Sequence, residues 1–185
     1  MRRLACLLLL AVAALTGCGS SSSSSSSSSA AETAATSPSP APPELEAALE
    51  EAAASGVPVR VPPVLLSSAL PAGANHAEVL RSPPDSYTLA LSTKPKCRFK
   101  SDCVVAIFSG SAEPNAHFGG DELKLAGGIE GVYEPGRCGP GCKFGTVAWR
   151  QDGNTYGVGV PEASTRELEV LANEAIEAEP IAAGK

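Results

Sequence analysis

The chain has 185 residues, of which 43 % are hydrophobic, 4 % aromatic and 18 % charged, and its formal net charge is −6. This length allows one domain of ordinary size together with additional segments. The 18 glycines and 16 prolines are too many for a helical bundle, and the hydrophobic content is too high for a wholly disordered chain. The acidic balance argues against a nucleic-acid-binding protein.

The N-terminal segment has the layout of a secretory signal peptide. Two arginines precede an apolar stretch over residues 4–15, which is too short to span a membrane. The motif Leu15-Thr16-Gly17-Cys18 resembles the lipobox of bacterial lipoproteins. The resemblance implies a signal peptide over residues 1–17 and a mature chain that begins with a diacylglyceryl group on Cys18. The alternative is an ordinary secreted protein that is cleaved near Ala13 or Gly17.

A lipid anchor would determine where the protein resides. Residues 1–17 carry two basic and no acidic side chains, so their removal changes the net charge from −6 to −8. Anionic lipid repels such a body, whereas an acyl anchor contributes about 0.8 kcal/mol per buried methylene group. We therefore expect a lipid-anchored protein on the extracellular or periplasmic side of the cell membrane.

A tether is expected between the anchor and the folded part. Residues 20–29 are ten consecutive serines, and residues 37–43 include four prolines. Neither segment can bury apolar area, so residues 18–42 are expected to be disordered. Treated as a coil, 24 such residues span about 27 Å. The remaining residues, 43–185, are expected to form a single domain.

The first elements expected in that domain are a helix and several strands. Apolar residues recur at helical spacing from Pro43 to Ala52, and Gly56 suits a C-terminal stop. Val57–Val61, which prolines interrupt, is typical of an edge strand. Alternation and β-branched residues predict further strands over Tyr87–Leu91, Cys103–Phe108, Glu122–Leu125 and Ile129–Glu134.

A β-hairpin is the clearest prediction, formed by Phe144–Gln151 and Asn154–Val160. The intervening Asp152-Gly153 supplies the two positive-φ residues of a type I′ turn. This turn sets a register in which Trp149 faces Tyr156 and Val147 faces Val158, all on one face.

The last element expected is an amphipathic helix. A capping box, Ser164-Thr165-Arg166-Glu167, predicts its start, and Pro180 ends the run. Its apolar stripe consists of Leu168, Leu171, Ala172, Ala175 and Ile176. This stripe needs a partner, and a sheet is the only large one. We therefore expect an α+β fold: an antiparallel β-meander of five to six strands packed by the C-terminal helix, with a short N-terminal helix.

Four cysteines follow Cys18: Cys97, Cys103, Cys138 and Cys142. An even number in an exported domain indicates two disulfides. We favour the pairs Cys97–Cys103 and Cys138–Cys142, each of which closes a short loop, and the crossed pairing is the alternative. A redox motif is disfavoured, because three residues rather than two separate Cys138 from Cys142. A zinc site formed by four thiolates is also disfavoured, because five residues separate Cys97 from Cys103.

A basic segment is a candidate for surface or ligand contact. It contains Lys94, Lys96, Arg98 and Lys100 in alternation, so an extended chain would place all four on one face. Such a face could contact anionic lipid headgroups or wall polymers. The alternative is a protected edge strand, whose lysines prevent unwanted pairing.

Recognisable catalytic motifs are missing from the sequence. There is no nucleophile elbow, phosphate-binding loop or dinucleotide fingerprint. His117 could hold a metal ion with Asp121 and Glu122, but the polar, glycine-rich surroundings favour a solvated turn. We expect no enzyme activity, no metal and no cofactor; the alternative is an unrecognised hydrolase or redox activity.

The C-terminal segment from Gly145 to Ile176 resembles an uncharacterised class of bacterial extracytoplasmic domains that end in a Trp-containing hairpin and an amphipathic helix. The shared residues are Val147-Ala148-Trp149, Asp152-Gly153, Tyr156 and the apolar positions from Leu168 to Ile176. This resemblance implies no catalytic residues. A more remote resemblance is to lipoprotein-carrier folds, in which a sheet and helices enclose an apolar cavity.

We therefore expect a non-catalytic binding or accessory module. The alternative is a carrier of a lipid or another apolar ligand in a cavity between the sheet and the C-terminal helix. The expected partners are the membrane, through Cys18, and a cell-envelope protein or an apolar ligand; no nucleic acid is expected.

Overall fold

The structure is a computed structural model that describes residues 43–63, 73–81, 84–98, 100, 102–113, 119–137 and 143–182. All of these residues belong to one compact unit, Pro38–Lys185. The expected signal peptide, Cys18 and the tether lie outside the described residues, as do Cys138, Cys142 and His117. The predictions for these positions therefore stay predictions.

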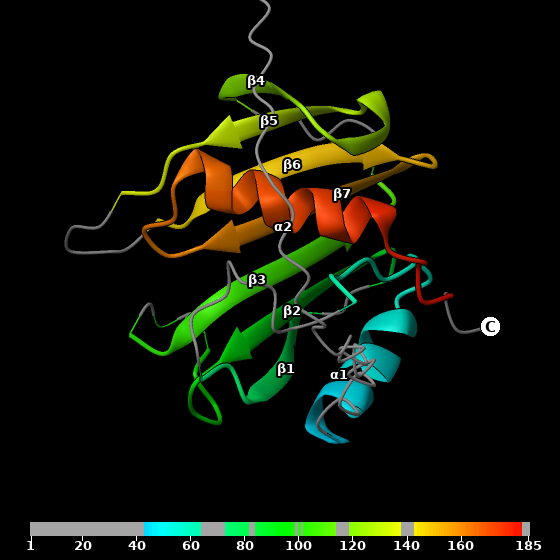
Figure 1. Cartoon of the computed structure of the whole chain (residues 1–185). Coiled ribbons are helices and arrows are strands. Elements are labelled where there is room, and N and C mark those ends of the chain that lie inside the picture. Colours follow the sequence, from blue (N-terminus) through cyan, green and yellow to red (C-terminus); the bar gives the residue numbers. More distant parts are fainter. Residues whose placement is uncertain are drawn as a thin grey trace, which may run out of the picture. The chain divides into compact units, whose positions relative to one another are not determined.

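The described part contains two α-helices, one short 3₁₀ helix and seven β-strands (Figure 1). The helices are α1 (Pro43–Ala53), η1 (Ala126–Gly128) and α2 (Thr165–Glu177). The strands are β1 (His76–Arg81), β2 (Ser86–Ser92), β3 (Val104–Ser111), β4 (Asp121–Lys124), β5 (Glu130–Glu134), β6 (Gly145–Gln151) and β7 (Asn154–Val160). The α+β prediction is confirmed, with seven strands where five to six were expected.

All seven strands form one antiparallel sheet in the order β1-β2-β3-β7-β6-β5-β4. The sheet consists of two meanders, β1–β3 and β4–β7, which meet where β3 pairs with β7. The chain therefore crosses from the middle of the sheet to its far edge between β3 and β4.

The segment Val57–Val61 is not a strand, which corrects the prediction. It makes one isolated antiparallel bridge, in which Val59 and Ile181 exchange two backbone hydrogen bonds of 2.9 Å. The Val57 N–H donates instead to Ser55 Oγ at 3.3 Å, so it does not extend the ladder. The bridge joins the segment after α1 to the segment after α2.

The β6–β7 hairpin has the predicted register. Trp149 pairs with Tyr156 and Val147 with Val158, and the rings of Trp149 and Tyr156 stack with centroids 5.8 Å apart. The turn residues Asp152 and Gly153 have φ values of 51° and 78°, as a type I′ turn requires.

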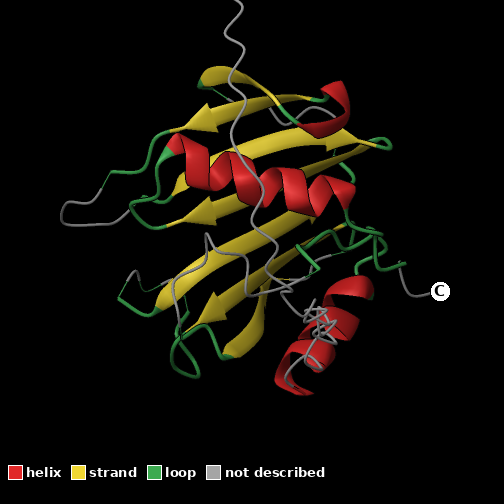
Figure 2. Ribbon diagram, viewed as in Figure 1, coloured by secondary structure: helices red, strands yellow, loops and turns green. Residues whose placement is uncertain are grey.

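Helix α2 covers this hairpin (Figure 2). The capping box is confirmed: the Ser164 hydroxyl accepts from the Glu167 N–H, and the Glu167 carboxylate accepts from the Ser164 N–H. The five predicted apolar residues of α2 are all buried. The Leu168 side chain lies directly over Gly145, so α2 packs on the face of the sheet that carries Val147 and Trp149. We call this face the inner face and the opposite one the outer face.

Candidate functional site

The outer face carries the candidate site. Because side chains alternate along a strand, Thr146, Ala148 and Arg150 of β6 lie on the outer face while Val147 and Trp149 lie on the inner face. The buried residues of α1 and α2 belong to the same core cluster as the inner-face side chains. In the part of the chain that the structure describes, both helices therefore cover the inner face.

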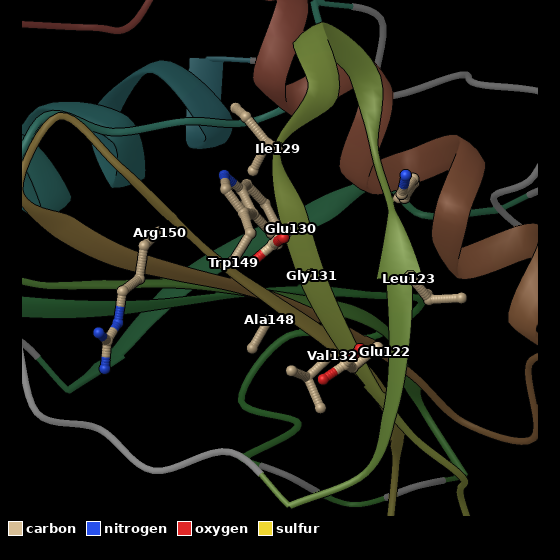
Figure 3. A pocket seen from close by; sticks show the side chains of 10 residues that line it. Glu122, Leu123, Ile129, Glu130, Gly131, Val132, Ala148, Trp149 and Arg150 are labelled. Carbon is tan, nitrogen blue, oxygen red and sulfur yellow. The ribbon is translucent and has the colours of Figure 1, made fainter.

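The first hollow lies over β4, β5 and β6 and has a volume of about 700 Å³ (Figure 3). The strand register places six of its lining side chains on the outer face: Glu122, Lys124, Glu130, Val132, Ala148 and Arg150. Apolar Val132 and Ala148 stand between charged groups of both signs. The hollow can therefore accept a ligand with an apolar centre and polar ends.

The second hollow, of about 620 Å³, lies over β2, β3, β7 and β6. It shares Ala148 with the first hollow, so the two are continuous along the outer face. Its outer-face side chains are mostly small or hydroxyl-bearing: Ser86, Thr88, Ser109, Ser111, Thr146 and Thr155. Ile107 and Phe144 form its apolar end.

Two glycines form the floor of the second hollow. Gly157 and Gly159 lie on β7, the fourth of the seven strands in spatial order. An alanine Cβ would lie 3.0 Å from Ser109 Oγ at position 157 and 3.3 Å from Thr146 Cγ2 at position 159. Neither glycine has the positive φ that favours glycine. Gly157 is half-buried and leaves the β7 backbone partly open to the hollow, whereas Gly159 is buried beneath Thr146 and Phe144.

The basic segment between β2 and β3 is a loop, which corrects the prediction of an extended chain with four cations on one face. Cys97 and Cys103 form a disulfide with a Cα–Cα distance of 5.9 Å, which folds the segment back on itself. Lys96 and Arg98 have φ values of 57° and 42°, outside the strand region. The edge-strand alternative also fails, because β1 and β4 form the edges.

The four basic side chains are nevertheless exposed together on this loop. Cys97 and Cys103 are buried and form a second small core with Val104, against which Ile107 and Phe144 pack. The loop is therefore fixed against the apolar end of the second hollow.

A buried arginine, Arg60, links three parts of the domain. Its Nη1 donates to the carbonyls of Ile176 and Ala178 at 3.1 and 3.3 Å, and its Nη2 donates to Asp152 Oδ2 at 2.9 Å. The guanidinium also lies over the Tyr156 ring, 5.6 Å from its centroid. Arg60 thus fastens the end of α2 and the β6–β7 turn to the segment after α1, and its role is structural.

Two buried tyrosines border this arginine. Burial raises the pKa of Tyr87, although its hydroxyl accepts a hydrogen bond from the Arg60 N–H at 3.1 Å. Burial also raises the pKa of Tyr156, against the opposing effect of the Arg60 guanidinium. Both phenols are therefore neutral at ordinary pH, and both side chains belong to the core.

The other candidate residues do not gather into a site. Asp121 and Glu122 are neighbours on β4, so their side chains point to opposite faces. His76 lies at the start of β1, where its Nδ1 is 2.7 Å from Glu44 Oε2. Within the described ranges, no group of three or more His, Cys, Asp or Glu side chains could hold a metal ion. None of the described helices is long and apolar enough to cross a membrane.

Comparisons of the chain with protein-family models, with curated proteins and with solved structures found no match. The resemblances noted from the sequence therefore stay predictions.

The outer face was missed by the sequence reasoning. The small residues of β7, Gly157 and Gly159, were assigned only to a hairpin strand. They alternate with the apolar residues Tyr156, Val158 and Val160, and this pattern in the sequence indicates that β7 carries no side chain at two positions of its outer face.

Proposed function

We propose that this protein is a membrane-anchored extracytoplasmic lipoprotein whose folded domain is a non-catalytic binding or accessory module. The motif Leu15-Thr16-Gly17-Cys18, after a basic and an apolar segment, supports a lipid anchor on Cys18. The disulfide between Cys97 and Cys103 supports an oxidising location, because such bonds are rare in the cytosol.

The observation that carries the binding role is the glycine floor of the outer face. Glycine weakens the interior of a strand, and it often marks a place where a ligand or another backbone approaches closely. The half-buried Gly157 provides such a place in the second hollow, which is continuous with the first. The occupant that we propose is an extended segment of a cell-envelope protein, whose backbone would lie over β7 and its side chains beside the hydroxyl groups.

A carrier function would require space between the sheet and α2. The α2 side chains Leu168, Leu171, Ala172 and Ala175 are all 0 % exposed in the core. Side chains therefore occupy the region where the carrier hypothesis expects a ligand. We therefore propose that the partner binds to the outer face of the sheet.

The anchor is tested by replacing the two N-terminal cysteines separately in cells that attach acyl groups. Cys18→Ser should abolish labelling by radioactive palmitate and release the protein from the membrane fraction. Cys6→Ser is the matched control, because Cys6 lies inside the apolar stretch, and it should change neither result. Labelling that persists in Cys18→Ser would contradict the anchor.

The binding face is tested by photocross-linking in the same cells. A photoreactive side chain at Thr146 of the second hollow should give a discrete adduct with one cell-envelope protein. The control position is Arg166, an exposed residue in the first turn of α2. The same adducts from both positions, or no adduct from position 146, would contradict binding at the outer face.

A further inference from the structure

We propose that the loop between β2 and β3, which carries Lys94, Lys96, Arg98 and Lys100 and is here called the basic loop, is a contact surface for an anionic phospholipid bilayer. The contact would orient the domain with this end toward the membrane. The inference rests on the proposed function in one respect: the chain is held near a bilayer through Cys18.

The basic loop lies beside the point at which the preceding chain enters the domain. Helix α1 begins at Pro43, and Glu44 Oε2 contacts His76 Nδ1 at the start of β1. His76 pairs with Ser92, the last residue of β2 before the loop. A shallow hollow is lined jointly by Glu44, His76 and Lys96. A tether from Cys18 therefore joins the domain next to the basic loop.

The four cations of the loop are available to an external anion. In the described part of the chain, none of the four side chains forms an ion pair. Two carboxylates lie beside the loop: Glu44, which contacts His76, and Glu78, whose Oε1 accepts from the backbone N–H of Arg98 at 3.0 Å. Asp102 is the one exposed acid described within the loop. The four cations of the basic loop therefore outnumber these three acidic residues by one.

The loop geometry is fixed before any contact is made. The Cys97–Cys103 disulfide closes the loop, and both cysteines are buried beside Val104. A surface that is already ordered loses less conformational entropy when it binds. The cations therefore form a preorganised surface.

Acidic residues occupy the opposite ends of the same strands. Asp85 lies just before β2 and Glu113 just after β3, at the ends remote from the loop. Near a negatively charged bilayer, this separation of charge favours the orientation with the basic loop toward the lipid.

The experiment uses the chain from residue 18 with Cys18→Ser, which keeps the whole compact unit and lacks the anchor. Its binding is measured by co-sedimentation with vesicles of phosphatidylcholine, alone or with about one third phosphatidylglycerol. The loop variant carries Lys94→Gln, Lys96→Asn, Arg98→Asn and Lys100→Gln. Asn is used at the two positive-φ positions because it tolerates them. The control variant has the same net charge and carries Lys124→Gln, Ala54→Glu, Ala112→Glu and Gln151→Glu, all at the end of the strands remote from the loop.

The chain from residue 18 has a net charge of −8, but contact through the basic loop keeps the acidic residues at the remote end beyond a Debye length from the lipid. The parent chain should therefore bind the anionic vesicles but not those of phosphatidylcholine alone, and salt should weaken the binding. Each basic residue near the surface contributes about fivefold to partitioning, so the loop variant should bind at least tenfold more weakly. The control variant should bind within about threefold of the parent. Circular dichroism verifies that each variant is folded.

Failure of the parent chain to bind anionic vesicles, or equal losses in both variants, would overturn the inference. Because the anchor is absent from all these chains, such a failure would leave the lipid modification of Cys18 untouched. Conversely, an unlipidated Cys18 in cells would overturn the proposed function without affecting vesicle binding.

Discussion

Replacing Arg60 with Met tests whether one buried cation fastens α2 to the rest of the domain. The Arg60 side chain is 6 % exposed, and it donates three hydrogen bonds to Ile176, Ala178 and Asp152. Met preserves most of the apolar stem and removes all three donors. The carbonyls at the end of α2 then lose their partner.

The expected destabilisation follows from these contacts. A buried acceptor without a partner costs about 1–3 kcal/mol; this applies in full to the Ile176 carbonyl and in part to the partly buried Ala178 carbonyl. Part of this loss is offset, because removal of the guanidinium ends the cost of burying a charge. That charge includes an Nε without a hydrogen-bond partner among the described residues. We therefore expect Arg60→Met to lower the free energy of unfolding by about 2–3 kcal/mol.

Urea denaturation without reducing agent, followed by circular dichroism, measures this change. The control is Asp152→Asn, because Asp152 is 70 % exposed and Asn tolerates its φ of 51°. An exposed partner of this kind should contribute less than about 1 kcal/mol. A free energy of unfolding for Arg60→Met within about 0.5 kcal/mol of the parent value would refute this role of Arg60. An equal loss of unfolding free energy in Asp152→Asn and Arg60→Met would also refute it.

Three further predictions concern the disulfide, one glycine and the buried tyrosines. The double variant Cys97→Ala, Cys103→Ala should lose about 2 kcal/mol of the free energy of unfolding in urea, because it lacks the disulfide that closes a short loop in the unfolded chain. The parent should lose a similar amount when it is reduced, and a reduced parent that is as stable as the oxidised parent would contradict this. Gly110→Ala should lose about 2 kcal/mol in the same assay, because its Cβ would lie 2.3 Å from Tyr87 Cε1. Gly159→Ala, with its nearest contact at 3.3 Å, should lose less, and equal losses would refute the argument. Above the ordinary tyrosine pKa of 10.0, folding should weaken as pH rises, because burial raises the pKa values of Tyr87 and Tyr156. Their phenolate absorbance should rise together with the loss of circular dichroism, and ionisation in a folded protein would contradict this.

The hairpin and α2 could be predicted from sequence because their signals are local. Asp152-Gly153 sets both the turn type and the register, so the Trp149–Tyr156 pair follows directly. The capping box likewise sets where α2 begins, and helical spacing then identifies its buried stripe. The predictions for these elements are confirmed because the turn or cap residues and the pattern of apolar residues predict the same local structure.

The site could not be predicted because it depends on non-local packing. The order of the strands decides which residues share the outer face, and alternation along a strand does not specify its neighbours. The alternating cations of residues 94–100 have a strand-like pattern, yet the disulfide and the turns keep them in a loop. Arg60 lies in a proline-rich segment with no pattern of its own, and its partners come from distant parts of the chain.

The central claim is that residue 18 carries the lipid that holds this domain outside the cytoplasm. Its most direct test is the intact mass, with the N-terminal peptide, of protein extracted from membranes of cells able to acylate it. The account predicts a chain that starts at Cys18 and carries a diacylglyceryl group. A chain that retains residues 1–17, or a soluble chain without acyl groups, would contradict it.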